Sequence, residues 1–236
     1  MKVAKVVIIT VILYFIPYTL SAQIIHDLLD KIKIEYDAKN YYTSVNLCRD
    51  IIEICNKEPE SECWFTNVMK NVYRYKGLSE FEIYKKELTV KRLESSIQSL
   101  EISYNLYQDA EILYLYGYLG AFKSVLMKNR TNVDGLVTAW KGIIELYGHN
   151  NWIVTNELID NIKDYIKIAE KFTTPIPAKN YSGYFAKYII LMACKLADKA
   201  QLSNKDKIYF NKYVKKYNKN NLNKLLGKKS LGKLTG

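Results

Sequence analysis

The fold is decided by one stretch, residues 109–122, which reads DAEILYLYGYLGAF. Asp109 opens a helix here, and the apolar residues after it predict that this helix reaches about Met127. A similar apolar helix face is predicted near the N-terminus, where apolar residues from Ile25 to Tyr36 recur at spacings of three and four. The chain has only 10 glycines and 4 prolines, too few for the many tight turns of an all-β protein. The sequence therefore predicts an all-α protein.

Breaks between the apolar stripes divide the chain into consecutive helices joined by short turns, which indicates antiparallel hairpins. Pro59 ends one helix, and Gly77 is expected to be a helix C-cap. Ser79, with Glu82 three residues later, has the pattern of a capping box that opens the next helix. We expect helices over about residues 25–36, 45–55, 61–75, 79–107, 109–127, 133–147, 152–171, 182–201 and 203–218.

Residues 109–122 resemble the first helix of a tetratricopeptide (TPR) repeat, a family of stacked helical hairpins. The resemblance implies that Gly117 and Ala121 are small so that a neighbouring helix can approach closely. Residues 93–103 resemble a TPR second helix, with Ser95 or Ser96 where the family usually carries alanine, and residues 40–45 are similar to the start of another. The 34-residue period drifts and the family's Trp-Leu-Gly start is not intact. An irregular helical bundle is the alternative to a TPR-like array.

The N-terminus has the order of a secretory signal peptide. Lys2 and Lys5 precede the apolar run 6–16, Pro17 breaks this run, and the small residues of Leu20-Ser21-Ala22 suit cleavage before Gln23. We therefore expect a periplasmic or secreted protein with no spanning segment after cleavage; an uncleaved membrane anchor is the alternative. The expected domains are a signal peptide (1–22), a TPR-like array (23–171), a helical pair (178–218) and a disordered basic tail (219–236).

The net charge of +11 comes mainly from the C-terminus. Residues 23–194 are almost neutral, with 21 Lys and Arg against 22 Asp and Glu, whereas residues 195–236 carry twelve lysines against Asp198 and Asp206. Such a tail favours an anionic surface, and the absence of arginine from it argues against nucleic acid. The lysines expected to bind an anionic envelope or membrane surface are Lys212, Lys215, Lys216, Lys219, Lys224, Lys228 and Lys229.

The four cysteines give no metal motif, because no two of them form a Cys-x-x-Cys pair. Cys55 and Cys63 flank a turn and could form a disulfide in an oxidising compartment, whereas Cys48 and Cys55 are too far apart on one helix. The alternative is that Cys48, Cys55, Cys63 and Cys194 are all small buried apolar residues.

No motif for catalysis, phosphate binding or calcium binding is present in the sequence. His26 and His149 are isolated and are expected to be solvated. We therefore predict a protein that is not an enzyme and has no cofactor.

Tyrosine is unusually common, with 21 residues against 7 phenylalanines. Tyr104, Tyr107, Tyr114 and Tyr118 recur across one predicted hairpin and could line a groove that binds a protein or an extended peptide. The alternative is that they are packing residues. The sequence thus favours an exported, non-catalytic scaffold; binding to an anionic surface through the lysine-rich C-terminus and a secreted enzyme of unrecognised type are the alternatives.

Overall fold

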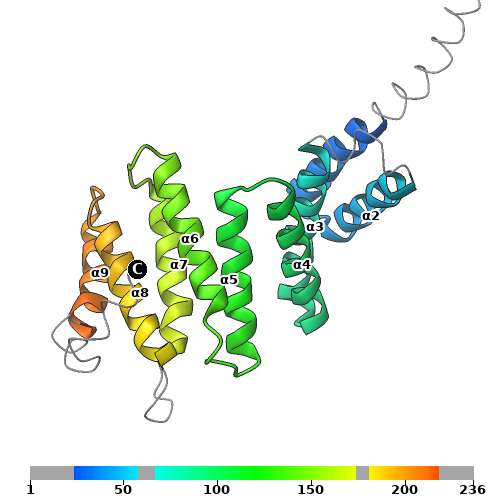
Figure 1. Ribbon diagram of the computed structural model, residues 1–236. Coiled ribbons are helices and arrows are strands. Elements are labelled where there is room, and N and C mark those ends of the chain that lie inside the picture. Colours follow the sequence, from blue (N-terminus) through cyan, green and yellow to red (C-terminus); the bar gives the residue numbers. More distant parts are fainter. Residues whose placement is uncertain (1–23, 58–66, 174–180, 218–236) are drawn as a thin grey trace, which may run out of the picture. The chain divides into compact units, whose positions relative to one another are not determined.

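The structure, a computed structural model, describes residues 24–57, 67–173 and 181–217 (Figure 1). Regular secondary structure in these residues is helical, without a β-strand, which confirms the predicted all-α class. The signal peptide, Cys63 and the tail from residue 219 onward lie outside the described residues. Beside a helix over residues 24–37, the helices are α2 (Tyr41–Lys57), α3 (Asn67–Glu87), α4 (Val90–Leu106), α5 (Ala110–Leu126), α6 (Asp134–His149), α7 (Asn156–Phe172), α8 (Tyr181–Ala197) and α9 (Asn204–Lys216).

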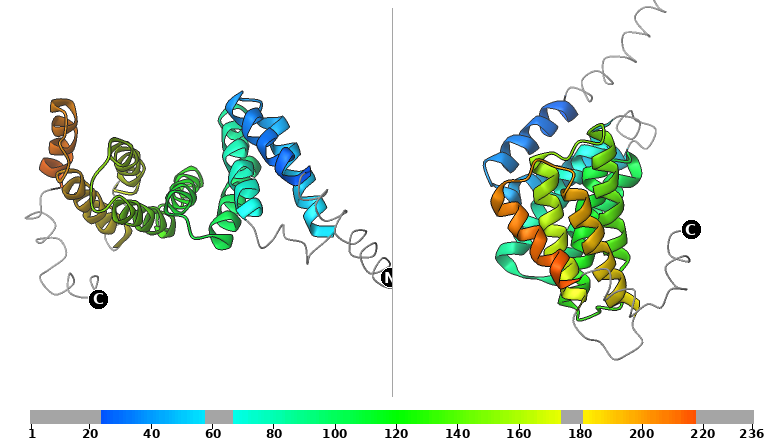
Figure 2. Two further views of the ribbon diagram at one scale, coloured as in Figure 1. Left: turned by 90° about the horizontal axis from the view of Figure 1, so that it is seen from above. Right: turned by 90° about the vertical axis from the view of Figure 1, so that its left-hand side faces the viewer.

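The described helices form two compact units, divided between Gln108 and Asp109. In unit 1, α3 packs against α2 and α4; in unit 2, α5 packs against α6, α6 against α7, α7 against α8 and α8 against α9. The hairpin partners α5 and α6 lie side by side in opposite directions (Figure 2). This packing of sequence neighbours is compatible with a helical repeat. The division falls inside the range 23–171 that the sequence assigned to one array.

The helix boundary expected around Gly77 and Ser79 is wrong. α3 continues without a break through both residues, and the chain turns at Leu88, which has a positive φ of 55°. A Cβ on Gly77 would lie only 2.7 Å from Leu100 Cγ of α4, so this glycine allows two helices to approach. Ser79 is buried, and its hydroxyl donates to Ser44 Oγ of α2 at 3.0 Å. Both residues are small because helices pack on them rather than because a helix ends there.

The α5–α6 hairpin depends on glycines from both helices. A Cβ on Gly117 would overlap the backbone of α6 at Ala139, and a Cβ on Gly135 would overlap the backbone of α5 at Ala121. Gly142 faces the α5 backbone in the same way. Gly117 and Ala121 therefore lie at a close contact between helices, as expected.

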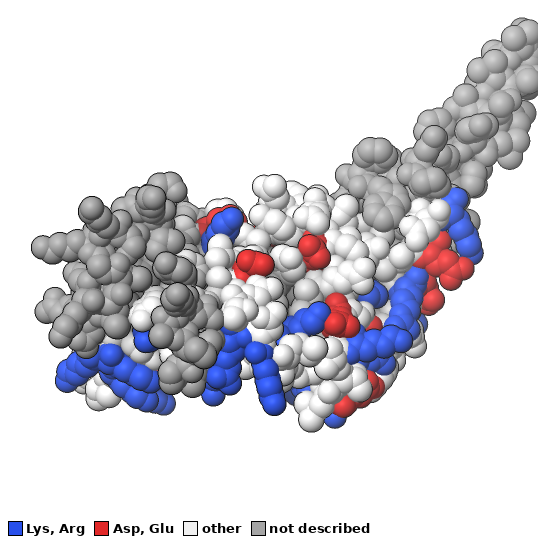
Figure 3. Space-filling model, turned by 60° about the horizontal axis from the view of Figure 1, so that its bottom comes forward, with Lys and Arg blue, Asp and Glu red and all other residues white. Residues whose placement is uncertain are grey.

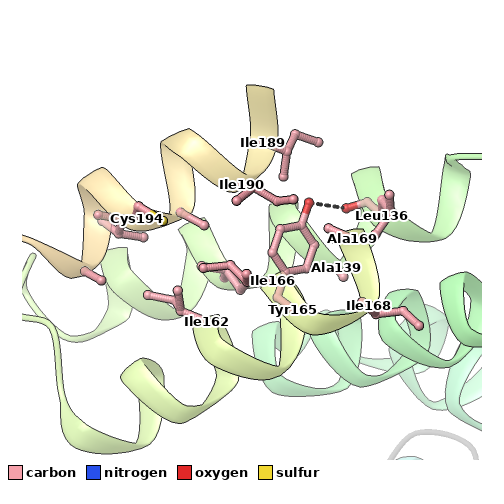
Figure 4. Close-up of a cluster of buried hydrophobic side chains, with 14 of the residues drawn as sticks. Leu136, Ala139, Ile162, Tyr165, Ile166, Ile168, Ala169, Ile189, Ile190 and Cys194 are labelled. Atoms are coloured by element: carbon pink, nitrogen blue, oxygen red, sulfur yellow. Dashed lines mark hydrogen bonds between the residues drawn. The ribbon is translucent and has the colours of Figure 1, made fainter. Parts of the chain in front are cut away.

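The core of unit 2 gathers around α7, whose buried residues recur at helical spacing (Figure 4). Tyr165 is fully buried, and its hydroxyl donates to the carbonyl oxygen of Leu136 in α6 at 3.2 Å, which satisfies its polar end. α9 also belongs to this core, because Phe210, Tyr213 and Tyr217 are buried. Removing α9 would therefore expose apolar core surface.

Replacing Gly117 by alanine should reduce the free energy of unfolding by about 3 kcal/mol, because the new methyl group overlaps a backbone that cannot move aside easily. Gly120→Ala is the matched control in the same helix, since its Cβ would lie 3.6 Å from Gly135 Cα, an ordinary contact. The control should be neutral or stabilising by up to about 1 kcal/mol, because alanine favours helix. Chemical denaturation measures both changes. Equal stability of the two variants would contradict the close packing.

Candidate functional site

The tyrosines expected to form a groove have different environments. Tyr104 and Tyr107 belong to unit 1; Tyr107 is 54% exposed, and the ammonium nitrogen of Lys70 lies 4.1 Å from the centre of its ring. Tyr114 and Tyr118 belong to unit 2, with ring centres 6.0 Å apart. The two pairs therefore belong to different units.

Tyr114 is a packing residue in this structure. It is only 4% exposed, and its hydroxyl donates to the carbonyl oxygen of Asn161 in α7 at 3.1 Å. Burial raises its pKa well above the ordinary value for tyrosine. Tyr118 is half-buried beside it. The hydrogen bond joins α5 to α7, so the polar tip of Tyr114 is used inside the unit.

A pocket of about 480 Å³ opens on unit 1 between α2, α3 and α4. Its wall combines aliphatic and aromatic surface with amides, a serine hydroxyl and charged groups. α2 contributes half of the lining residues, and α3 and α4 contribute the others. They are Arg49, Ile52, Glu53, Asn56, Lys57, Tyr73, Lys76, Gln98, Ser99 and Ile102.

Lys76 of α3 is the most buried cation of this pocket. Its ammonium group donates to Ser99 Oγ at 2.8 Å and to Ser95 Oγ at 3.3 Å, both on α4. Partial burial lowers the pKa of Lys76, because desolvation penalises the charged form, and the nearby Glu80 opposes this only in part. Two neutral hydroxyls thus hold a cation in place, and an anion in the pocket would stabilise its charge.

A buried carboxylate connects the three helices behind the pocket. The side chain of Glu80 in α3 is 1% exposed, and Arg92 Nη1 of α4 donates to its Oε2 at 2.9 Å. Arg49 Nη2 of α2 lies 3.6 Å from Oε1, beyond hydrogen-bond distance, and Oε1 accepts no hydrogen bond within the described residues. Arg49 also lines the pocket, so the carboxylate of Glu80 lies close to one of the pocket's cations.

The balance of charge in the pocket suits an anionic ligand. Arg49, Lys57 and Lys76 stand against one lining acid, Glu53, which already pairs with Lys57 at 2.8 Å. The amide side chains of the rim can both donate and accept hydrogen bonds. A carboxylate that entered the pocket would meet Lys76 in a partly desolvated setting, where charge pairing is stronger than in water.

Metal ligation has no candidate among residues 24–57, 67–173 and 181–217, which contain no group of three or more His, Cys, Asp or Glu placed to hold an ion. Cys48 and Cys194 are buried, and burial raises the pKa of each thiol to about 12. Both thiols therefore stay protonated near neutral pH. Cys55 is buried as well, and its expected partner Cys63 lies outside the described residues.

Of the lysines predicted to bind an anionic surface, three lie within the described residues and four lie outside them. Lys212 and Lys215 are exposed on α9, while Lys216 pairs with Glu170 of α7. On the face drawn in Figure 3, basic side chains gather at the α9 end of unit 2. No helix within the described ranges has the length and apolar character needed to cross a membrane. The four predicted lysines outside the described residues are Lys219, Lys224, Lys228 and Lys229.

Reasoning from the sequence missed the pocket. Its residues come from three helices, and no spacing along the chain indicates that these helix faces meet. The one signal in this region was the serine-rich segment 93–103, which contains Ser95 and Ser99.

Glu80→Gln should lower the free energy of unfolding by about 2–3 kcal/mol, because it removes a buried anion and leaves Arg92 and Arg49 without its charge. Glu53→Gln is the control, since the Glu53–Lys57 pair is exposed and should leave stability almost unchanged. Urea denaturation near neutral pH measures both variants. If Glu80→Gln were as stable as the control, the ion cluster would not hold the three helices together.

Comparison of the chain with known protein families, with curated proteins and with solved structures finds no match.

Proposed function

We propose that this chain is a non-catalytic binding protein that holds an acidic, extended segment of another protein in the pocket between α2, α3 and α4. The observation that carries the proposal is the half-buried Lys76, held by two serine hydroxyls in a pocket where cations outnumber acids. We further propose that the hairpins are a TPR-like array and that residues 1–22 export the chain.

Two properties of the pocket support an extended peptide. Gln98 and Asn56 can pair with the N–H and C=O groups of a peptide backbone. Ile52 and Ile102 offer apolar surface for a neighbouring side chain. The volume of about 480 Å³ is sufficient for a short stretch of chain, but it also lies within the range of about 300–1,000 Å³ usual for small-molecule sites, so it does not separate the two kinds of ligand.

Three pools of fluorescently labelled extended peptides, acidic, neutral and basic, test this proposal by fluorescence anisotropy with the full chain. The acidic pool should bind most tightly. Gln98→Glu should weaken its binding at least about fivefold, because like charges repel at the pocket rim. The matched control, Gln201→Glu, adds the same charge to an exposed position in unit 2 and should bind as the unaltered chain does.

Equal binding of all three peptide pools, or unchanged binding by Gln98→Glu, would reject the pocket as a site for acidic peptides. Circular dichroism of each variant separates a lost site from a lost fold.

The second candidate function is binding to an anionic envelope or membrane surface, and α9 supplies the observation that favours it. Lys205, Lys207, Lys212 and Lys215 are exposed, and the single acid of this helix, Asp206, pairs with Lys163 of α7 at 2.7 Å. Exposed lysines without neighbouring acids attract an anionic surface diffusely, and salt weakens that attraction.

The double variant Lys212→Gln/Lys215→Gln should bind anionic vesicles at least about tenfold more weakly, since each cation near such a surface contributes about 1 kcal/mol. These substitutions keep α9, whose buried Phe210 and Tyr213 belong to the core, whereas truncation before α9 would not. The control Lys31→Gln/Lys33→Gln removes the same charge from an exposed face of unit 1. Vesicle sedimentation at several salt concentrations measures binding; equal losses in both variants would attribute it to net charge alone.

A further inference from the structure

The turn between α6 and α7 has an unusual backbone. Two successive residues, Asn151 with φ 53° and Trp152 with φ 63°, lie in the left-handed region. Asparagine tolerates this conformation, but tryptophan adopts it at a cost in stability. The turn therefore holds a bulky residue at a position where a small one would be more stable.

Hydrogen bonds hold this turn in one shape. The N–H groups of Asn151 and Trp152 donate to the carbonyl oxygens of Gly148 and Tyr147, both at 3.1 Å. The N–H of Ile153 donates to the carbonyl oxygen of Asn150 at 3.0 Å. The side chains of the turn are thus presented by a fixed backbone.

The two side chains at the tip are apolar and exposed. Trp152 is 65% exposed and Ile153 is 64% exposed. The rings of Trp152 and Tyr147 make a T-shaped contact, with centres 5.0 Å apart. This contact supports the indole from one side and leaves most of it in solvent.

A lysine from the α8–α9 turn stands beside this cluster. The ammonium group of Lys199 donates to Tyr147 Oη at 3.3 Å and lies 5.1 Å from the centre of that ring. The α6–α7 and α8–α9 turns lie at the same end of unit 2 (Figure 1). Between Lys195 and Lys207 the chain carries four lysines and two aspartates, of which Asp206 is neutralised by Lys163. The exposed apolar side chains therefore lie at the same end of unit 2 as the lysine-rich segment between α8 and α9.

We infer that the Trp152–Ile153 turn inserts into the headgroup layer of an anionic lipid bilayer, with Lys199 beside the lipid phosphates. Tryptophan prefers this layer because its ring is apolar and its N–H is polar. Shallow insertion needs only a few apolar side chains together with cations. A stable protein interface needs about 800 Å² on each partner, far more than two side chains supply. The inference is independent of the peptide pocket and gives the proposed surface binding an apolar anchor.

Intrinsic fluorescence of the full chain, with vesicles of phosphatidylcholine alone or mixed with phosphatidylglycerol, tests the insertion. Anionic vesicles should shift Trp152 emission to the blue and protect it from iodide quenching, whereas the pure phosphatidylcholine vesicles should do so weakly. Trp140 packs beside Tyr165 in the core, with ring centres 5.8 Å apart, and should contribute a constant signal. The remaining tryptophan, Trp64, lies outside the described residues, so the Trp152 variant identifies the source of the shift.

Trp152→Asn should reduce binding to anionic vesicles at least tenfold and should keep or raise the melting temperature, because asparagine tolerates the left-handed backbone. Ile153→Ser should also weaken binding. The matched control is Leu88→Asn, another exposed residue in this backbone conformation, with φ 55° and 71% exposure, and it should bind normally.

No spectral shift with anionic vesicles, or full binding by Trp152→Asn, would overturn the inference. Loss of self-association in Trp152→Asn without any effect on vesicles would also overturn it and assign the turn to a second copy of the chain. The Trp152→Asn variant should bind acidic peptides as the unaltered chain does when no lipid is present. A failure of the proposed lipid insertion can therefore be distinguished from a failure of the proposed peptide pocket. When the Lys212→Gln/Lys215→Gln variant is bound to anionic vesicles, its Trp152 emission should still shift to the blue. This result separates insertion of the turn from electrostatic attraction through α9.

Discussion

Close approach between neighbouring helices is the constraint on which both units depend. In unit 2, Gly117 and Gly135 let α5 and α6 touch along their backbones, where a single methyl group would not fit. In unit 1, Gly77 lets α4 lie against α3. Packing at this distance maximises dispersion contacts between helices, but it leaves no room for a side chain at the crossing point. The sequence of each hairpin is therefore restricted most at its smallest residues.

Close packing in unit 1 also determines its polar chemistry. Ser96 donates to the carbonyl oxygen of Gly77 at 2.7 Å, and Ser103 donates to that of Lys70 at 2.8 Å, so serines of α4 bond directly to the α3 backbone. The same helix face brings Ser99 to the ammonium group of Lys76. A buried hydroxyl needs a partner, and Ser96 and Ser103 find theirs on α3 because the two helices are close. The pocket and its cation are thus consequences of the packing.

The two units expose different chemistry. Unit 1 has a pocket in which cations are held by hydroxyls and a buried carboxylate, an arrangement suited to charged groups that must be oriented. Unit 2 has an apolar core around Tyr165, a lysine-bearing outer helix and one turn where exposed apolar side chains sit on a strained backbone. Strain of this kind lowers stability, so it marks Trp152 as a residue that the fold itself does not require.

The sequence by itself determined the helical class and most helix limits from residue 109 onward, because periodicity and local composition act within a few residues. The small positions Gly117 and Ala121 were expected from the resemblance to a TPR helix. The sequence predicted a wrong helix boundary at Gly77 and Ser79. A glycine or a serine gives the same signal in the sequence whether it ends a helix or lies where another helix packs closely. The pocket around Lys76 and the burial of Tyr114 were decided only by tertiary structure. Both depend on which helix faces meet, and that choice is made by packing between segments far apart in the chain.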